Sequence, residues 1–153
     1  MGLLDGAHAR ALRSAQNLWD RGRTAEAIGM LESTRRHLWP RVFATDALIL
    51  ATLATYVTEC GDPMRGQELL QAVPLNDRPR TDAQLICLGA RCSARAAAGN
   101  LAGARADRDA IFEADSTHAA LAVADAALRE GRRSILVRAA GGRSPARVPP
   151  IDA

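Results

Sequence analysis

The sequence predicts an all-α protein in which antiparallel helical hairpins are stacked side by side. Alanine, the strongest helix former, accounts for about a fifth of the 153 residues. Aromatic residues, which favour strands, make up only 3% of the chain. Apolar residues recur at the three- and four-residue spacing of a helix in a series of segments, and each segment ends at a glycine. Helices packed on helices are therefore favoured over a sheet.

Four glycines mark the turns of the predicted hairpins. Each comes just after an apolar stripe, where a glycine can adopt the left-handed conformation that ends a helix. A new helix is predicted to begin about two residues later, and so short a connection makes the two helices antiparallel. The glycines are Gly22, Gly61, Gly99 and Gly131, and the stripes before them lie within residues 11–19, 50–57, 85–96 and 121–128.

The second helix of each predicted hairpin opens with its own start signal. Thr24 and Asn100 can accept hydrogen bonds from the first backbone N–H groups of the helices that follow them. Asp62 combines such a cap with Pro63 at the first helical position, where proline is favoured. After the fourth glycine, residues 132–137 are predicted to form a short eighth helix.

Longer breaks separate the hairpins, at Trp39-Pro40, at residues 74–79 and at residues 115–117. The turn glycines lie 39, 38 and 32 residues apart. A repeat of this length with one hairpin in each repeat is typical of α-solenoids. Trp39 is expected to pack at the junction of the first two hairpins, because tryptophan buries a large apolar area.

A recurring pattern accompanies these hairpins: a small residue, a glycine seven positions later and a further small residue five after that. It reads Ala15-Gly22-Ala27, Ala54-Gly61-Gly66 and Cys92-Gly99-Ala104. In this pattern the chain resembles the tetratricopeptide-repeat (TPR) family, whose unit is a helical hairpin of about 34 residues. The resemblance covers residues 8–137, and its best-matching unit follows Gly99.

The resemblance implies a short TPR-like solenoid of about 7–8 helices over residues 1–139. Residues 140–153, which contain Arg, Pro and Gly, are expected to form a flexible tail. A closed bundle of the same hairpins is the alternative architecture. In an open stack of few units, an uncapped terminal hairpin can bury its apolar face in a homodimer, so a homodimer is also considered.

The resemblance also implies a function. In TPR proteins the first helix of each hairpin lines a concave groove, and this chain is therefore expected to bind a peptide or helix of another protein there. The expected partner-binding groove residues are Gln16, Trp19, Asp20, Thr55, Thr58, Glu59, Ser93, Asp125 and Arg129. The Asn and Lys pattern with which chaperone adaptors of the family clamp a terminal carboxylate is missing, so that form of recognition is not expected.

Charge is distributed unevenly along the chain. Every one of the 20 basic residues is arginine, and the net charge is +3. Six arginines lie within residues 129–153 against two acids, and the remaining 14 arginines against 15 acids give −1. A nearly neutral body with few aromatic residues is a poor surface for nucleic acid. Two alternatives stay open: electrostatic binding of nucleic acid or an acidic partner by the Arg-rich C-terminal region, and a small secretion-type chaperone.

No catalytic, cofactor or metal site is expected, and an enzyme is the least favoured class. His8, His37 and His118 lie in different segments, without neighbouring ligands, and are interpreted as surface histidines. Cys87 and Cys92 are five residues apart, which places them on different faces of a helix. We expect both to be free buried thiols.

The expected location is the cytoplasm. Three cysteines without framework spacing suit a reducing compartment. The N-terminus has no basic segment followed by an apolar one, so no signal peptide is expected. The longest apolar run, residues 47–57, contains threonines and is too short to cross a bilayer, so no membrane association is expected.

Overall fold

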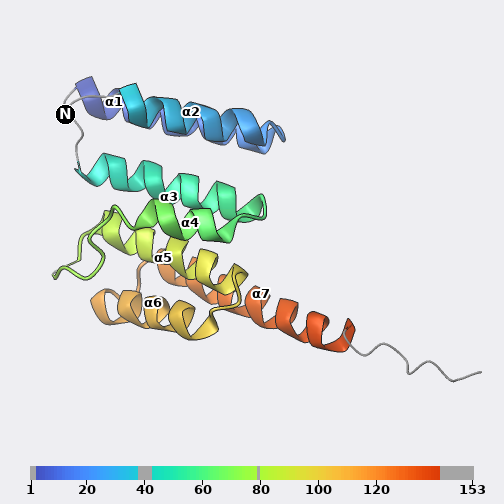
Figure 1. Cartoon of the computed structure of the whole chain (residues 1–153). Coiled ribbons are helices and arrows are strands. Elements are labelled where there is room, and N and C mark those ends of the chain that lie inside the picture. Colours follow the sequence, from blue (N-terminus) through green and yellow to red (C-terminus); the bar gives the residue numbers. More distant parts are fainter. Residues whose placement is uncertain (1–2, 38–42, 79, 142–153) are drawn as a thin grey trace, which may run out of the picture.

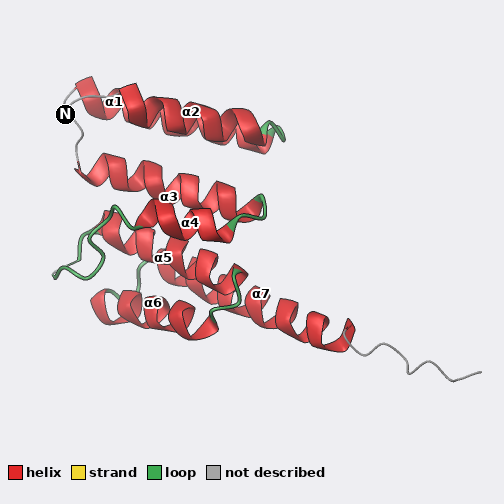
Figure 2. Cartoon of the chain, in the orientation of Figure 1, coloured by secondary structure: helices red, strands yellow, loops and turns green. Residues whose placement is uncertain are grey.

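Seven helices and no strand make up the part of the chain that the structure, a computed structural model, describes: residues 3–37, 43–78 and 80–141. Figures 1 and 2 show these helices lying in successive layers. The all-α prediction is thus confirmed. Trp39 and residues 142–153, most of the predicted tail, lie outside the described residues. The helices are α1 (Leu3–Asp20), α2 (Thr24–His37), α3 (Phe43–Glu59), α4 (Pro63–Leu70), α5 (Asp82–Ala97), α6 (Leu101–Ala114) and α7 (Ala120–Gly141).

Three of the four predicted turn glycines end a first helix and lead directly into a second. Gly22, Gly61 and Gly99 have positive φ angles of 75°, 97° and 87°. Side chains other than glycine rarely adopt this conformation, so the glycines allow the tight turns. They connect the antiparallel pairs α1/α2, α3/α4 and α5/α6.

Caps fix where several helices begin. Asp62 accepts a hydrogen bond from the backbone N–H of Arg65 at 3.1 Å, and Asn100 accepts one from Gly103 at 2.9 Å, both as predicted. Thr81 and Gln84 form a reciprocal capping box at the start of α5. The predicted cap Thr24 differs, because it is the first residue of α2 rather than the residue before it.

The layers follow one another in chain order. Each of the first helices α1, α3, α5 and α7 contacts the next one in this series. Each second helix, α2, α4 or α6, packs against the first helix of its own pair and against the first helix of the next layer. Every apolar stripe is therefore covered by the neighbouring layer. One buried cluster joins α1, α2 and α3, and a larger cluster joins α3 to α7.

The prediction of a fourth turn at Gly131 and an eighth helix over residues 132–137 was wrong. α7 continues through Gly131 as one helix of 22 residues. A Cβ atom at Gly131 would lie 3.0 Å from Cδ2 of Leu101 and 3.2 Å from both Cβ and the carbonyl oxygen of Ala96. This glycine is therefore explained by the close approach of α7 to α5 and α6, and residues 132–137 remain part of α7.

Candidate partner-binding groove

The four first helices line a long hollow surface, which we call the inner groove. Its first half is a hollow of ≈ 540 Å³ between α1, α3, α5 and α7. Most of its floor is apolar and comes from Ile86, Val123 and alanines of α3, α5 and α7. The polar residues of this lining are Gln16, Thr52, Thr55, Tyr56, Asp82 and His118.

The second half of the inner groove is a hollow of ≈ 620 Å³ that runs along α5 and α7 to Glu59 at the end of α3. Val123, which is 51% exposed, lines both hollows, so they adjoin each other at this side chain. Ser93 and Ala97 of α5 face Ala126, Glu130 and Arg138 of α7 across it. The inner groove thus has an apolar floor and charged residues towards this end.

An aromatic pair forms the α1 side of the groove. The rings of Trp19 and Tyr56 stack with centroids 4.1 Å apart and an interplanar angle of 5°. The Tyr56 hydroxyl donates a 3.1 Å hydrogen bond to Gln16, whose amide donates one of 2.7 Å to Asp20. Burial and the nearby Asp20 and Glu59 carboxylates raise the pKa of Tyr56. Trp19 remains partly exposed, while Tyr56, on which it stacks, is buried.

Three hydroxyl groups of α3 and α5 in the groove donate hydrogen bonds to the backbone. Thr52 and Thr55 donate 2.9 Å bonds to the carbonyls of Leu48 and Ala51, one turn earlier in α3. Ser93 donates a 3.2 Å bond to Gly89 in the same manner. Each of these hydroxyls thus bonds to a carbonyl of its own helix, a common arrangement for Ser and Thr within helices.

His118 and Asp82 form a fixed pair at the open edge of the first hollow. The Nδ1 atom of His118 accepts a 3.1 Å hydrogen bond from the backbone N–H of Ala120. Its Nε2 atom therefore carries the proton and donates to Asp82 at 2.5 Å. The pair ties the start of α7 to the start of α5. His118 is only 12% exposed, so the prediction of a surface histidine was wrong here.

Six of the nine predicted groove residues lie in the two hollows or directly beside them. Gln16 and Thr55 line the first hollow, and Glu59 and Ser93 line the second. Trp19 stacks on the lining residue Tyr56. Asp20 adjoins them through its hydrogen bond with Gln16.

Thr58, Asp125 and Arg129 lie elsewhere. The Thr58 hydroxyl faces Gly66 of α4, is buried, and has no hydrogen-bond partner among the described residues. Asp125 and Arg129 line a separate hollow of ≈ 310 Å³ between α6 and α7, where Asp125 accepts a 3.0 Å hydrogen bond from Arg108. Asp125 and Arg129 were predicted as groove residues on the assumption that Gly131 is the turn of a fourth hairpin. Because Gly131 instead faces α5 and α6, the α7 residues that line the groove include Val123 and Glu130 rather than Asp125 and Arg129.

The remaining candidate reactive groups are in inert surroundings or at the surface. Cys87 and Cys92 are fully buried, as predicted, and burial raises the pKa of each thiol to about 12. Their sulfurs lie 3.2 Å from the carbonyl oxygens of Ala47 and Ala104. His37 is exposed as expected, but the prediction for His8 was wrong, since it is only 3% exposed.

Sequence reasoning missed Tyr56, Asp82, Ile86, Val123 and Glu130 as groove residues. Part of the signal was present, because residues 86, 90, 93 and 97 recur at helical spacing beside the core stripe of α5. A sequence alone does not say whether such a second stripe faces a neighbour or an open groove.

Across the described ranges, no three His, Cys, Asp or Glu side chains are placed to share a metal ion. No helix in these ranges is both long and apolar enough to cross a membrane. Comparison of the chain with family models, with curated proteins and with solved structures gives no significant match.

Proposed function

We propose that this protein is an interaction module that holds a segment of another protein in its inner groove. The observation that carries the proposal is the pair of adjoining hollows lined by α1, α3, α5 and α7, with their apolar floor and exposed Val123. An apolar groove of this size matches the way amphipathic helices and extended peptides dock on helical proteins. The TPR resemblance of the hairpins supports the same function.

The charges around the groove favour a cationic partner segment. Glu59, Asp82 and Glu130 line it, Asp20 adjoins it, and Arg138 is its one arginine among the described lining residues. Glu59 and Glu130 are exposed and form no ion pair with another described residue. The groove is thus acidic in a chain whose net charge is +3. Complementary charge speeds association and selects among partners.

The anchors of such a segment would be apolar. Ile86 and Val123 offer aliphatic contact in the middle of the groove, and Trp19 offers a partly exposed indole at its α1 side. Buried aromatic and aliphatic anchors carry most of the energy in typical interfaces, while the charged rim adds less. The partner segment is therefore proposed to carry apolar residues on one side and Arg or Lys around them.

No catalytic role and no cofactor are proposed. The hydroxyls of Thr52, Thr55 and Ser93 donate to backbone carbonyls, and His118 holds Asp82 and the start of α7. A cytoplasmic location is proposed on the same ground as before, the three unpaired cysteines. Dimerisation through the terminal hairpin at α1 stays a prediction, to be checked by sedimentation.

Site-specific photo-crosslinking tests this function. A photoreactive phenylalanine analogue at Val123 would lie in the groove, and the same analogue at Phe112 would lie on α6, outside it. The two positions are matched, with exposed fractions of 51% and 50%. We expect a crosslink to a cationic, partly apolar partner segment from position 123 and none from position 112. Equal crosslinking at both positions, or an acidic crosslinked segment, would contradict the proposal.

A second candidate is electrostatic binding by the Arg-rich C-terminal region. It is favoured by the hollow between α6 and α7, where Arg105, Arg108, Arg129 and Arg132 outnumber Asp109 and Asp125. Deletion of residues 142–153 together with Arg129→Gln and Arg132→Gln separates the two functions. If the unaltered chain binds its partner with a steep salt dependence and the altered chain does not bind, this candidate is favoured. If the altered chain still binds the partner, the inner groove is favoured.

A further inference from the structure

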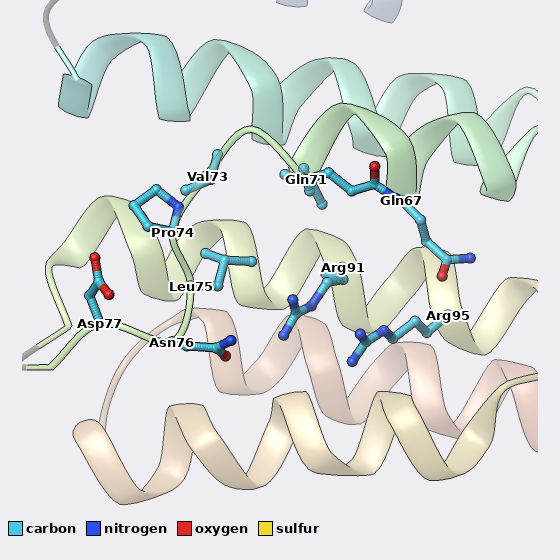
Figure 3. A pocket seen from close by; sticks show the side chains of 10 residues that line it. Gln67, Gln71, Val73, Pro74, Leu75, Asn76, Asp77, Arg91 and Arg95 are labelled. Atoms are coloured by element: carbon cyan, nitrogen blue, oxygen red, sulfur yellow. The ribbon is translucent and has the colours of Figure 1, made fainter.

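A further hollow, separate from those described above, lies on the side of α5 that faces α4. It encloses ≈ 400 Å³ between α4, the α4–α5 loop and α5. We call it the loop hollow, and Figure 3 shows the residues that line it. These residues come from α4 (Gln67 and Leu70), from the loop (Gln71, Val73, Pro74, Leu75, Asn76 and Asp77) and from α5 (Arg91 and Arg95).

The loop wall is held in place by hydrogen bonds from Gln84 in the first turn of α5 and from Arg80 just before that helix. The Gln84 amide donates a 2.6 Å bond to the carbonyl of Pro74, and Arg80 donates a 2.9 Å bond to the carbonyl of Leu75. The side chains of Val73 and Leu75 are buried beneath the loop. The hollow therefore exists before any ligand enters it, which lowers the cost of binding.

Two arginines of α5 are fixed at the base of this hollow by a single carboxylate. Asp107 of α6 is only 2% exposed. Arg91 donates to both of its oxygens, at distances from 2.7 to 3.2 Å, and Arg95 donates to one at 3.0 Å. Arg95 also donates to the carbonyl of Gly103 at 3.3 Å. Two guanidinium groups thus share one carboxylate and retain one positive charge in a partly buried place.

The remaining polar lining consists largely of amides. Figure 3 shows both guanidinium groups pointing into the hollow and Asn76 facing them from the loop. Gln67 and Gln71 close the α4 side. The only lining carboxylate in the described ranges, Asp77, lies well away from the two arginines. Guanidinium forks and amide N–H groups are the donors with which proteins bind carboxylate and phosphate oxygens.

We propose that the loop hollow is a binding site for a small oxyanion, either a phosphate or a small carboxylate compound. Arg91 and Arg95 would supply the charge, Asn76 and the glutamines would supply further hydrogen bonds, and Asp107 keeps the two arginines in position. The site is independent of the inner groove, since residues 91 and 95 of α5 do not line that groove.

Titration calorimetry of the full chain with inorganic phosphate and with citrate tests the site. The proposal predicts saturable binding of one anion per chain, and the preferred anion distinguishes a phosphate ligand from a carboxylate one. Arg95→Gln should weaken binding at least about tenfold, because it removes a charge-assisted donor. Asp107 keeps its three bonds from Arg91 in this variant, so the fold is expected to remain intact.

Two further variants keep this test specific. Asn76→Asp adds a carboxylate at an exposed loop position and should also weaken binding. Arg10→Gln makes the same charge change as Arg95→Gln at an exposed position of α1 and should leave binding unchanged. Equal effects of Arg95→Gln and Arg10→Gln would overturn the proposal, as would the absence of saturable binding for both anions.

Discussion

Helices α1 and α2 rest on α3 through few contacts, whereas α5 is surrounded by α3, α4, α6 and α7 (Figure 1). The cluster that buries the N-terminal hairpin has six buried members and includes the Trp19–Tyr56 stack. The C-terminal block, α5 to α7, shares a larger cluster and contains the buried Asp107 with its two arginines. In a layered protein each layer is stabilised mainly by its neighbours, so the end with fewer contacts should open first.

The difference matters for the inner groove. Its floor around Ile86 and Val123 belongs to the C-terminal block, while Gln16 and Trp19 come from the N-terminal hairpin. A partner segment would therefore meet a rigid surface at one end and a less stable one at the other. We expect local opening of α1 and α2 to alter only the part of the groove that they form.

The largest effect on stability is expected from Asp107→Ala, which destabilises the C-terminal block. It leaves two partly buried arginines without their carboxylate and should lower the free energy of unfolding by about 3–5 kcal/mol. Because α5 contacts four helices, the whole stack should unfold at lower urea concentration in one transition. The exposed neighbour Asp109→Ala is the matched control and should change stability by less than about 0.5 kcal/mol.

Leu31→Ala should destabilise the N-terminal hairpin, α1 and α2, with little effect on the other layers. Leu31 of α2 is fully buried, and the cavity left by its truncation should cost about 3 kcal/mol. Amide hydrogen exchange should accelerate in α1 and α2 and remain slow in α5 and α6. Equal acceleration in all layers would show that the two regions unfold as one unit and would remove the contrast between them.

Alkaline pH should weaken the C-terminal part of the stack in a graded way. The pKa of Cys87 and of Cys92 is raised from 9.0 to about 12, so both thiols stay protonated in the folded protein while they ionise in the unfolded chain above pH 9. Stability is therefore full below pH 9 and falls between pH 9 and 12, by about 1.4 kcal/mol per pH unit for each thiol.

Urea titrations at a series of pH values measure this slope. Cys92→Ala should remove the contribution of one thiol, and Cys60→Ser, at an exposed turn position, should remove none. If Cys60→Ser reduced the loss of stability with pH and Cys92→Ala did not, the burial of Cys92 would be contradicted. The raised pKa of Tyr56 acts in the same direction and begins to lower stability above pH 10, the ordinary pKa of tyrosine.

Much of the fold could be predicted from the sequence because its local signals have local causes. Gly22, Gly61 and Gly99 have positive φ, and Asp62 and Asn100 cap their helices as expected. Gly131 follows an apolar stripe just as the others do, but its role depends on Leu101 and Ala96, which a sequence does not place beside it. The burial of His8 likewise depends on tertiary packing.

Of the residues predicted for the groove, those of the first three units line the hollows or adjoin them except Thr58, which faces α4, and those of the fourth unit do not. Gln16, Thr55, Glu59 and Ser93 lie in the groove because the first three layers share one geometry. Asp125 and Arg129 do not, because α7 is oriented by its close contact at Gly131. The loop hollow gave no sequence signal, since Arg91, Arg95 and Asn76 meet only after the α4–α5 loop is folded.

The affinity of the crosslinked partner segment for charge-reversed variants tests the central claim most directly. Glu59→Arg with Glu130→Arg reverses two carboxylates of the inner groove, and Glu68→Arg with Glu113→Arg reverses two exposed carboxylates outside it. Both double variants change the net charge equally. We predict that the groove variant binds the synthetic segment at least about tenfold more weakly and that the control binds it normally. Equal affinity of the two variants would contradict binding in the inner groove.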